Sequence, residues 1–507
     1  MKKIKIAFFK ILTPIDSQFP FRVQIESKYD NHPLINKEAI DEAIEEYNDK
    51  FHFQRGKSFF NISDLNLNIE GRFLAENLPE VQSIVIDEIC TKKTLYKILN
   101  KHEITHIALS TYASGLDKAI EIIKIIQSEF KDKELYIGGV GTVYPHLQEL
   151  VKLQNICIGN GVNWLREKFN LKLYGKNEFK IPKISGNFPG FPIPLKTAYF
   201  ITQIGCPYNC DFCITNNLLQ YNPFSRSREI IQYIKELSEN SKKDVFLYMN
   251  EPNAFFPELI WREVFDFFIK NPREIDHNVF IAFDGSLNHI NKFDLESIQN
   301  KSPLKFLLIS FGIESTLMGG YDKNRGNPEK VIERLNKLGI ITKHNYIVGL
   351  PFHTKKSLDL DIRNNLKFDS DLYAVSNFIP IPNTILYNQL SLEKRLYDRN
   401  LPPEFLYAYG FQPFNHEHLG GGFNILKHLY NALYESEKKL VNVYGKFANK
   451  LLDLFEISNS RKIKWAARIF LKLDNYYLNS FQLRMEKKIV NEYRKRMEIT
   501  KQRYKRF

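Results

Sequence analysis

Strand-like and helix-like segments alternate six times between residues 195 and 390. Each strand candidate is a short apolar run rich in β-branched and aromatic residues, and amphipathic stretches such as 227–239 and 327–339 stand between them. The strand candidates are residues 197–204, 244–250, 278–284, 305–314, 341–349 and 372–379. Because strands that alternate with helices form parallel sheets, this pattern predicts an α/β partial barrel of six units, with its functional residues at the carboxyl ends of the strands.

The first 185 residues show the same alternation and predict a second, smaller parallel sheet. Its strand candidates are residues 3–11, 81–87, 104–110, 134–139 and 155–159. Lys5 and Lys10 interrupt the first apolar run and no small-residue cleavage site follows it, so we interpret the run as a buried strand and not as a signal peptide. Gly138, Gly139 and Gly159 end two of the strands, where sheets of this kind bind ligands.

Residues 181–194 contain four prolines and two glycines, a composition typical of a domain boundary. We therefore expect three regions, 1–185, 190–390 and 391–507. The last region has only helical periodicity, and its aromatic and glycine-rich opening is expected to form a loop or lid near the barrel mouth. Residues 483–507 carry ten Lys or Arg against three Glu. They predict a basic amphipathic helix, which either docks one face on the protein or contacts an anionic membrane surface or a polyanion.

A chain of 507 residues exceeds one compact core and fits two or three domains. With 43% hydrophobic and 14% aromatic residues it has ample material for cores, yet no apolar run reaches the eighteen or so residues of a membrane span. The five cysteines, Cys90, Cys157, Cys206, Cys210 and Cys213, are too few and too unevenly placed for a disulfide framework. This usage predicts a reducing compartment, the cytoplasm.

Three of these cysteines stand together as Cys206-Pro-Tyr-Asn-Cys210-Asp-Phe-Cys213, directly after the first barrel strand. A tetrahedral zinc site needs four ligands, typically in two separated pairs, and an ordinary ferredoxin cluster needs four thiolates. Three thiolates on a 4Fe–4S cluster leave one iron open to a small molecule, which is typical of a catalytic metal site. The alternative interpretation is three unrelated buried cysteines.

This Cys-x3-Cys-x2-Cys spacing, with the aromatic Phe212 before the last cysteine, resembles the signature of the radical S-adenosylmethionine (SAM) superfamily. The resemblance implies that Cys206, Cys210 and Cys213 hold a 4Fe–4S cluster and that SAM chelates its open iron. The reduced cluster would pass one electron, obtained from an external flavodoxin- or ferredoxin-type donor, to the SAM sulfonium. The resulting 5′-deoxyadenosyl radical would then abstract a hydrogen atom from the substrate.

Four further segments fit this resemblance in their order along the barrel. Glu251 follows Met249-Asn250, where the family has Gly-Gly-Glu-Pro, and would accept a hydrogen bond from the SAM amino group; the alternative is a solvated loop glutamate. Residues 310–315 look like Gly-Val-Glu-Ser and imply that Glu314 lies near the SAM ribose or methionyl end. Residues 347–351 resemble the Gly-Leu-Pro near the adenine, and residues 380–384 resemble the Pro-x-Pro-Gly-Thr after the sixth strand.

The first region resembles the Rossmann-like cobalamin-binding domain found in one branch of this superfamily. Residues 137–139 followed by Tyr144-Pro145 look like its Gly-Gly-x-His-x-x-x-x-Pro segment without the histidine. Residues 158–162 stand where Gly-Glu-Gly-Glu is usual, without the acidic positions. Residues 30–35 match the cobalt-binding Asp-x-His-x-x-Gly only in part, because isoleucine replaces the glycine. Relatives hold cobalamin without a histidine ligand, so its binding stays open.

The resemblance implies an enzyme that modifies an unactivated carbon of a lipid or secondary metabolite, by methyl transfer if cobalamin binds and otherwise by cyclisation, rearrangement or carbon–carbon bond formation. Two other classes stay open. One is modification of nucleic acid or peptide, with the basic tail as an electrostatic arm, although nucleic acid is the less expected partner. The other is a non-catalytic iron–sulfur protein, against which the retained Glu251 and Glu314 argue. No second cysteine cluster precedes the barrel, which disfavours the methylthiotransferase type.

Overall fold

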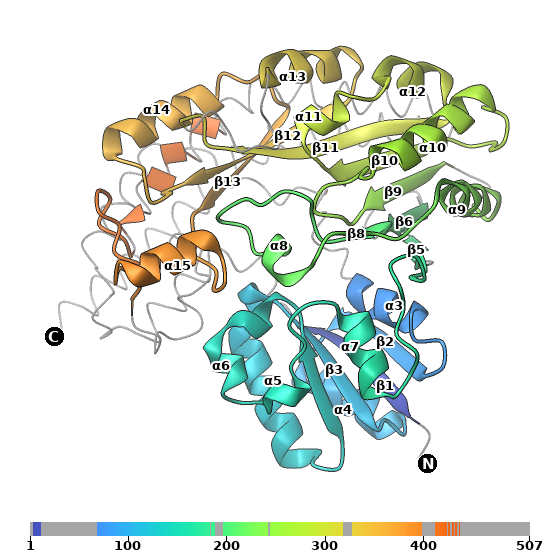
Figure 1. Cartoon of the computed structure of the whole chain (residues 1–507), viewed down its shortest axis with the longest axis vertical. Coiled ribbons are helices and arrows are strands. Elements are labelled where there is room, and N and C mark those ends of the chain that lie inside the picture. The colour runs from blue at the N-terminus through green and yellow to red at the C-terminus, as the bar shows by residue number, and fades with distance from the viewer. Residues whose placement is uncertain are drawn as a thin grey trace, which may run out of the picture.

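The structure is a computed structural model of the 507-residue chain. It describes residues 4–11, 68–182, 184–187, 196–241, 244–317, 327–397 and 411–422, with several residues between 424 and 436. A small sheet near the N-terminus lies beside a larger curved sheet (Figure 1). The expected basic helix over residues 483–507 and the partial motif at residues 30–35 lie outside the described residues.

The N-terminal sheet has four parallel strands in the order β2-β1-β3-β4. These are β1 (Lys5–Ile11), β2 (Gln82–Ile89), β3 (His106–Thr111) and β4 (Glu134–Gly138). The first apolar run is therefore a buried strand, as predicted, and it lies inside the sheet between β2 and β3. It is apolar on both sides because both faces of the sheet are covered. The fifth expected strand, at 155–159, forms only a single bridge between Ile156 and Ile137.

Helices cover both faces of this sheet and produce three layers. They are α3 (Ile69–Glu76), α4 (Lys92–Lys101), α5 (Leu116–Glu129), α6 (Pro145–Gln148) and α7 (Gly161–Lys168). In α5 the buried Ala119, Ile122 and Ile126 recur at the spacing of one helical face. Successive residues of β1 point to opposite faces, so that Phe9 packs with α4 and α5 while Phe8 packs with α3 and α7.

The larger sheet has seven strands in the order β13-β12-β11-β10-β9-β6-β5. The six expected strands are present as β6 (Lys196–Phe200), β9 (Val245–Met249), β10 (Val279–Asp284), β11 (Leu304–Glu314), β12 (Ile341–Val348) and β13 (Leu372–Asn377). They are mutually parallel and adjacent in chain order, which is the arrangement of the predicted partial barrel. The seventh strand, β5 (Ile184–Asn187), lies inside the expected linker and pairs antiparallel with β6.

Helices follow the strands, and most of them lie along the outside of the curved sheet, whereas the last, α15, lies nearer the N-terminal sheet (Figure 1). They are α9 (Ser227–Glu239), α10 (Glu258–Lys270), α11 (Leu287–Ile290), α12 (Leu295–Lys301), α13 (Pro328–Lys337), α14 (Lys355–Asn365) and α15 (Ile385–Leu392). Local sequence sets where they begin. The Asn327 side chain accepts a hydrogen bond from the Lys330 N–H, and Pro328 occupies the first helical position.

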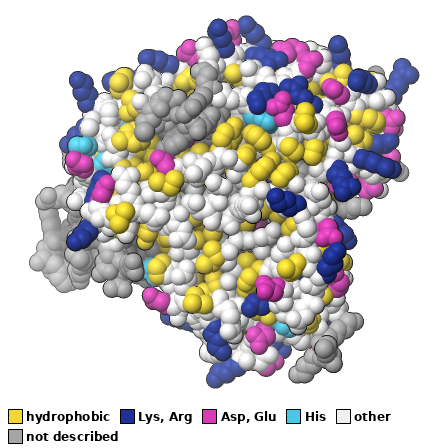
Figure 2. Space-filling view, in the orientation of Figure 1, with side chains coloured by type: hydrophobic (Ala, Val, Ile, Leu, Met, Phe, Trp, Pro, Cys, Tyr) yellow, Lys and Arg dark blue, Asp and Glu magenta, His cyan; other side chains and the backbone are white. Residues whose placement is uncertain are grey.

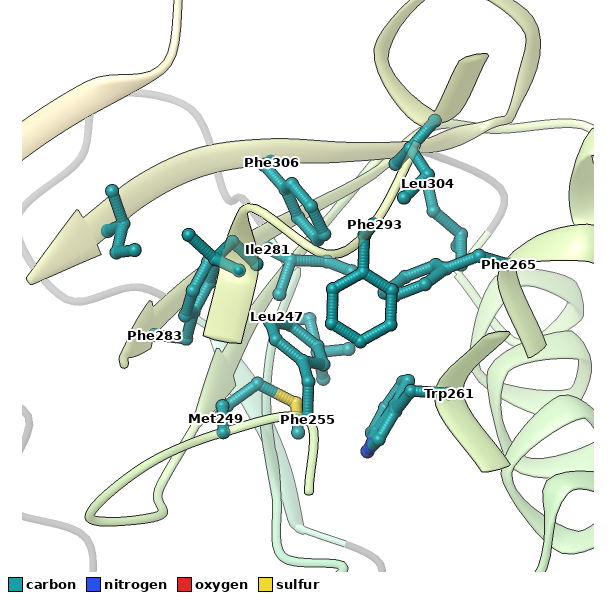
Figure 3. Close-up of a cluster of buried hydrophobic side chains, with 14 of the residues drawn as sticks. Leu247, Met249, Phe255, Trp261, Phe265, Ile281, Phe283, Phe293, Leu304 and Phe306 are labelled. Atoms are coloured by element: carbon teal, nitrogen blue, oxygen red, sulfur yellow. The ribbon is translucent and has the colours of Figure 1, made fainter. Parts of the chain in front are cut away.

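One face of the larger sheet packs on these helices through an aromatic core (Figure 3). Alternate strand residues form one side of this core, and Trp261 and Phe265 of α10 pack against them from the helix side. The Phe255 ring lies between the two layers, with its centroid 4.6 Å from Phe283 and 4.8 Å from Trp261. Because strand side chains alternate, the other residues of each strand lie on the opposite, inner face of the curved sheet.

The two sheets meet at the segment that carries the three clustered cysteines. This segment continues into α8 (Thr215–Leu218), which lies between the sheets in Figure 1. Ile214, Leu218 and Ile381 of the barrel region pack against the N-terminal core. Among the described residues, none of the helices has the length and apolar character required to traverse a bilayer.

Candidate functional site

The three clustered cysteines lie in the loop after β6, where a (β/α) barrel places its functional residues. Cys206, Cys210 and Cys213 are each partly exposed, and the Cys213 N–H donates to the Cys210 carbonyl over 3.1 Å. The loop is folded back by pairing between β7 (Gln203–Ile204) and β8 (Asn222–Pro223). Gly205 at φ +74° permits this turn, because a Cβ there would lie 2.4 Å from the Leu219 carbonyl oxygen.

The other two cysteines are chemically different. Cys90 and Cys157 are 4% and 6% exposed, and burial raises the pKa of each thiol to about 12. Thiols of this kind stay protonated and inert near neutral pH. Within the described residues, no three His, Cys, Asp or Glu side chains lie close enough together to hold a single metal ion. Thiolates on an iron–sulfur cluster each bind a separate iron, which is the arrangement that the resemblance implies for Cys206, Cys210 and Cys213.

Glu251, in the loop after β9, is buried and not a solvated loop residue. Its Oε1 accepts hydrogen bonds from the Thr202 N–H and, over 2.7 Å, from the Thr202 hydroxyl. Its Oε2 is buried without a hydrogen-bond partner, and burial raises the pKa of the carboxyl to about 8. A buried carboxylate oxygen in this state favours a donor or cation from a ligand.

Three more buried polar atoms without hydrogen-bond partners belong to the same part of the chain: Gln203 Oε1, Tyr221 Oη and Asn253 Nδ2. The pKa of Tyr221 is raised by burial and then by the negative charges of Glu251 and Cys206, so this residue lies near both the carboxylate and the cysteine loop. Sequence analysis missed these residues because none belongs to a recognisable spacing. Unpaired donors and acceptors beside a cluster-type loop fit a polar ligand such as SAM, with its amine and carboxylate.

Glu314 ends β11 in an unusual backbone conformation. Its φ of +65° is left-handed, and the pairing with β12 shifts by one residue between Gly312 and Glu314. Such bulges and strained residues concentrate beside functional sites, because the surrounding packing must hold them in place. The next residues are anchored firmly, since the N–H and the hydroxyl of Thr316 both donate to Asp361 Oδ1 over 2.6 Å.

Asp361 also connects this strand end with the next one. His353 Nε2 lies 3.2 Å from Asp361 Oδ2, and both side chains are buried. On its other side, His353 Nδ1 accepts from the N–H groups of Gly349 and Leu350, over 3.2 and 3.1 Å. Because Nδ1 is an acceptor, the ring proton lies on Nε2 and donates to Asp361. His353 thereby holds the backbone of residues 347–351, the segment that resembles the Gly-Leu-Pro near the adenine.

The carbonyl groups of the same two residues are held from the C-terminal region. Gln412 Nε2 donates to the Gly349 carbonyl over 2.7 Å, and His416 Nε2 donates to the Leu350 carbonyl over 2.9 Å. Burial lowers the pKa of His416 to about 4, so the ring is neutral near pH 7. Residues 411–422, expected as a loop or lid, include several fully buried side chains and brace the end of β12.

The cysteine loop contacts the remaining two expected segments. Phe212 packs beside Leu350 and Leu386 in one apolar cluster. The Leu386 N–H donates to the Asp211 carbonyl over 3.1 Å, and the Asn217 side chain donates to the Asn383 carbonyl over 2.7 Å. The structure therefore joins the cysteine loop to residues 347–351 and 380–384, although more than 130 residues separate them in the sequence.

The glycines at the N-terminal sheet edge, expected to contact cobalamin, contact protein. A Cβ at Gly139 would lie 2.4 Å from the Thr111 carbonyl oxygen, and one at Gly159 would lie 3.2 Å from the Leu218 carbonyl oxygen. The space that a Cβ would take at these two glycines is therefore filled by the chain itself. We assign no reaction step to that cofactor.

No family model matches the chain. No curated protein matches it either. Among solved structures it is similar to TsrM from Kitasatospora setae, a radical SAM methyltransferase, with cobalamin and a 4Fe–4S cluster bound (9% identity, 77% of this chain, 75% of that chain, TM-score 0.48). The same enzyme with tryptophan substrate and a SAM analogue gives 10% identity, 64% and 73% coverage and a TM-score of 0.46.

A third similar structure is the cobalamin-dependent SAM radical enzyme OxsB, with 18% identity over 74% of this chain and 59% of that chain, at a TM-score of 0.43. All three TM-scores are below 0.5, so these similarities assign neither a ligand nor a reaction to the chain. TsrM and OxsB, the proteins of these three structures, are both radical SAM enzymes.

Proposed function

We propose that this protein is a radical SAM enzyme in which Cys206, Cys210 and Cys213 hold a 4Fe–4S cluster and Glu251 binds SAM. The observation that carries the proposal is the unpartnered Oε2 of Glu251, buried near the cysteine loop. A buried carboxylate oxygen without a hydrogen-bond partner destabilises the protein, and a purely structural iron–sulfur protein would gain nothing from it. A ligand with a cationic amine would pair with this oxygen. When bound, the cluster and SAM supply the one-electron chemistry that generates the radical.

The chain's own residues bind and orient the ligand. Thr202 holds Oε1 of Glu251, so that Oε2 stays aimed at the ligand site, and Tyr221 offers a second polar atom beside it. Phe212 and Leu350 supply an apolar wall on the adenine side, which excludes water from the reacting atoms. The strained Glu314 is held in place by the bonds of Thr316 to Asp361.

The reaction after radical formation is modification of an unactivated carbon of a small molecule, with an external flavodoxin- or ferredoxin-type protein as electron donor. Methyl transfer would require cobalamin and would release S-adenosylhomocysteine; cyclisation, rearrangement or carbon–carbon bond formation would not. Measuring S-adenosylhomocysteine with and without added cobalamin separates these two types of reaction.

The basic tail, residues 483–507, is the segment on which contact with a membrane or with a polyanion would depend. Deleting it tests both partners, through binding of the protein to anionic vesicles and to RNA.

Cluster content and SAM binding test the assignment of the site. The full chain, reconstituted without oxygen, should hold about four irons. Its reduced cluster should change its electron paramagnetic resonance spectrum when SAM is added. Replacing Cys206, Cys210 and Cys213 by Ala should abolish the cluster, while replacing Cys90 and Cys157 should leave it intact. A cluster that forms normally but ignores SAM would refute the enzyme assignment.

A further inference from the structure

The inner face of the larger sheet carries a row of polar side chains. Residues in lateral register on parallel strands share one face, and Asp284 of β10 is in register with Ser310 of β11, which is in register with Lys343 of β12. The neighbours Phe283 and Ile309, one residue earlier, belong to the aromatic core on the opposite face. The three polar residues therefore lie on the inner face of the curved sheet, opposite the aromatic core.

Asp284 is held by a neighbouring strand. The Tyr248 hydroxyl of β9 donates to Asp284 Oδ2 over 3.0 Å, and this is the one hydrogen bond of the Asp284 side chain among the described residues. Tyr199 of β6 follows, with its ring centroid 6.1 Å from that of Tyr248. Its hydroxyl is buried without a hydrogen-bond partner although the residue is only 3% exposed. The Tyr199 hydroxyl is therefore a buried polar group that no described protein atom satisfies, and a polar ligand on this face of the sheet would pair with it.

The other end of the row carries the opposite charge. Lys343 is partly exposed and has no hydrogen bond or ion pair within the described part of the chain. Between the two charges, the Asn345 side chain donates to the Ser310 hydroxyl over 2.9 Å. Strands lie about 4.8 Å apart, so Asp284 and Lys343, two strands apart, have their Cα atoms roughly 10 Å from each other.

This polar row lies close to the cysteine loop. Asp284 ends β10, and the chain continues directly to Ser286. The Ser286 hydroxyl lies 3.3 Å from the Tyr208 hydroxyl, which belongs to the cysteine loop. The Ser286 N–H donates to the Asn253 side chain, two residues after Glu251. A molecule held by Asp284 would therefore lie beside the proposed SAM site.

We propose that this row is the substrate site and that it takes a small molecule with a cationic amine at one end and an anionic carboxylate or phosphate at the other. Asp284 binds the amine and Lys343 the anionic group, while Ser310 and Asn345 contact the polar groups between them. The inference rests on the proposed function. It narrows the expected substrate to a polar, charge-bearing metabolite, because a lipid chain would leave both charges unpaired.

Binding of matched probes to the full, cluster-loaded chain tests this inference without any SAM cleavage. The probes are 4-aminobutyrate and 6-aminohexanoate, with hexanoate and hexylamine as single-charge controls and dodecanoate as the lipid control, followed by saturation-transfer NMR and titration. We expect at least one zwitterion to bind ten times or more tightly than either single-charge control. Dodecanoate binding that outcompetes both zwitterions, or no zwitterion binding, would overturn the inference.

Variants locate the probe. D284N and K343Q should each weaken zwitterion binding tenfold or more, and Y248F, which removes the bond to Asp284, should weaken it less. D359N and K356Q, on the exposed side of α14, are matched controls that should not change it. Equal weakening by the controls would overturn the inference. Normal 5′-deoxyadenosine formation without zwitterion binding would refute this inference alone, and zwitterion binding without any SAM cleavage would refute the proposed function alone.

Discussion

A buried carboxylate with one unpaired oxygen is an expensive arrangement, and Glu251 keeps it beside the cysteine loop. The motif Met249-Asn250-Glu251 departs from the two glycines that the resemblance leads one to expect, yet the carboxylate keeps its place at the end of β9. Thr202 supports it from the end of β6. At the scale of single residues, the site therefore depends on a few polar atoms that the protein leaves unsatisfied.

Protonation of Glu251 should make the free energy of unfolding of the SAM-free protein depend on pH. The folded-state pKa of about 8 lies above the ordinary value of 4.5, so the folded state binds the proton more tightly than the unfolded state. This contribution to the free energy of unfolding is complete below pH 4.5 and is lost as pH rises toward 8. Urea unfolding of wild type and E251Q should show a difference that changes with pH across this window; parallel curves would contradict the burial argument.

The five cysteines should divide into two classes toward an alkylating reagent. With thiol pKa values near 12, Cys90 and Cys157 hold almost no thiolate at pH 8 and are buried as well. We expect iodoacetamide to modify Cys206, Cys210 and Cys213 of the native, cluster-free protein first, as read by peptide mass spectrometry. Reaction of all five cysteines at similar rates, without unfolding, would be inconsistent with this structure.

At the scale of elements, the segment after β12 is bound from two directions. All four backbone polar groups of Gly349 and Leu350 are hydrogen-bonded to side chains. The two N–H groups donate to His353, and the two carbonyl oxygens accept from Gln412 and His416. The C-terminal region thus braces the barrel rim instead of covering it loosely. Such bracing fixes the position of the apolar wall that Leu350 forms with Phe212.

Gly349 and Gly339 offer a matched pair for the close approach at this rim. Both have left-handed φ values, +77° and +72°, so alanine is strained at each by about 1 kcal/mol. A Cβ at Gly349 would lie 2.4 Å from Gln412 Nε2, whereas at Gly339 nothing lies within 4 Å. G349A should therefore lower the free energy of unfolding by about 1–3 kcal/mol more than G339A, as measured by urea titration. Equal losses would mean that Gln412 does not pack there.

His353 should act on SAM affinity through the backbone that it holds. His353→Leu leaves the N–H groups of Gly349 and Leu350 without an acceptor, a loss of about 1–3 kcal/mol, and we expect KM for SAM to rise about tenfold or more. His353→Asn offers a side-chain oxygen in place of Nδ1 and should recover part of the affinity. The measurement is 5′-deoxyadenosine formation against SAM concentration. A purely structural role would lower kcat and protein yield in both variants alike and leave KM unchanged.

Much of the element order could be predicted from the sequence, because buried parallel strands are continuous apolar runs such as those of β1 and β10. The edge strand β5 was missed, since it lies in a proline- and glycine-rich segment and depends on pairing with β6. The prediction of a strand at residues 155–159 was wrong, because this segment forms only one β-bridge, between Ile156 and Ile137. At Gly159 the backbone leaves the extended conformation, with φ +121°.

The cysteine loop and Glu251 could be found because their spacing is local. His353, Gln412 and Tyr221 could not, because they act through contacts between segments that lie far apart in the sequence. The row formed by Asp284 and Lys343 likewise exists only through the register of β10, β11 and β12, which no local pattern specifies.

At the scale of the whole molecule, the cysteine loop lies where the two sheets meet. Ile214 and Leu218 follow the last motif cysteine and pack directly on the N-terminal core, so the position of the loop depends on both regions. In Figure 2, Lys, Arg, Asp and Glu side chains lie mostly around the outside of the molecule, and apolar side chains gather in the middle of the face drawn.

The most direct test of the central claim is formation of 5′-deoxyadenosine by the full chain. The protein is reconstituted without oxygen, given SAM and dithionite, and compared with the Cys206, Cys210 and Cys213 triple alanine variant and with the C90A/C157A control. We expect 5′-deoxyadenosine from the wild type and the control but none from the triple variant. A fully loaded cluster that yields no 5′-deoxyadenosine, even with cell extract added as a source of substrate, would contradict the account and leave a structural or electron-carrying cluster in its place.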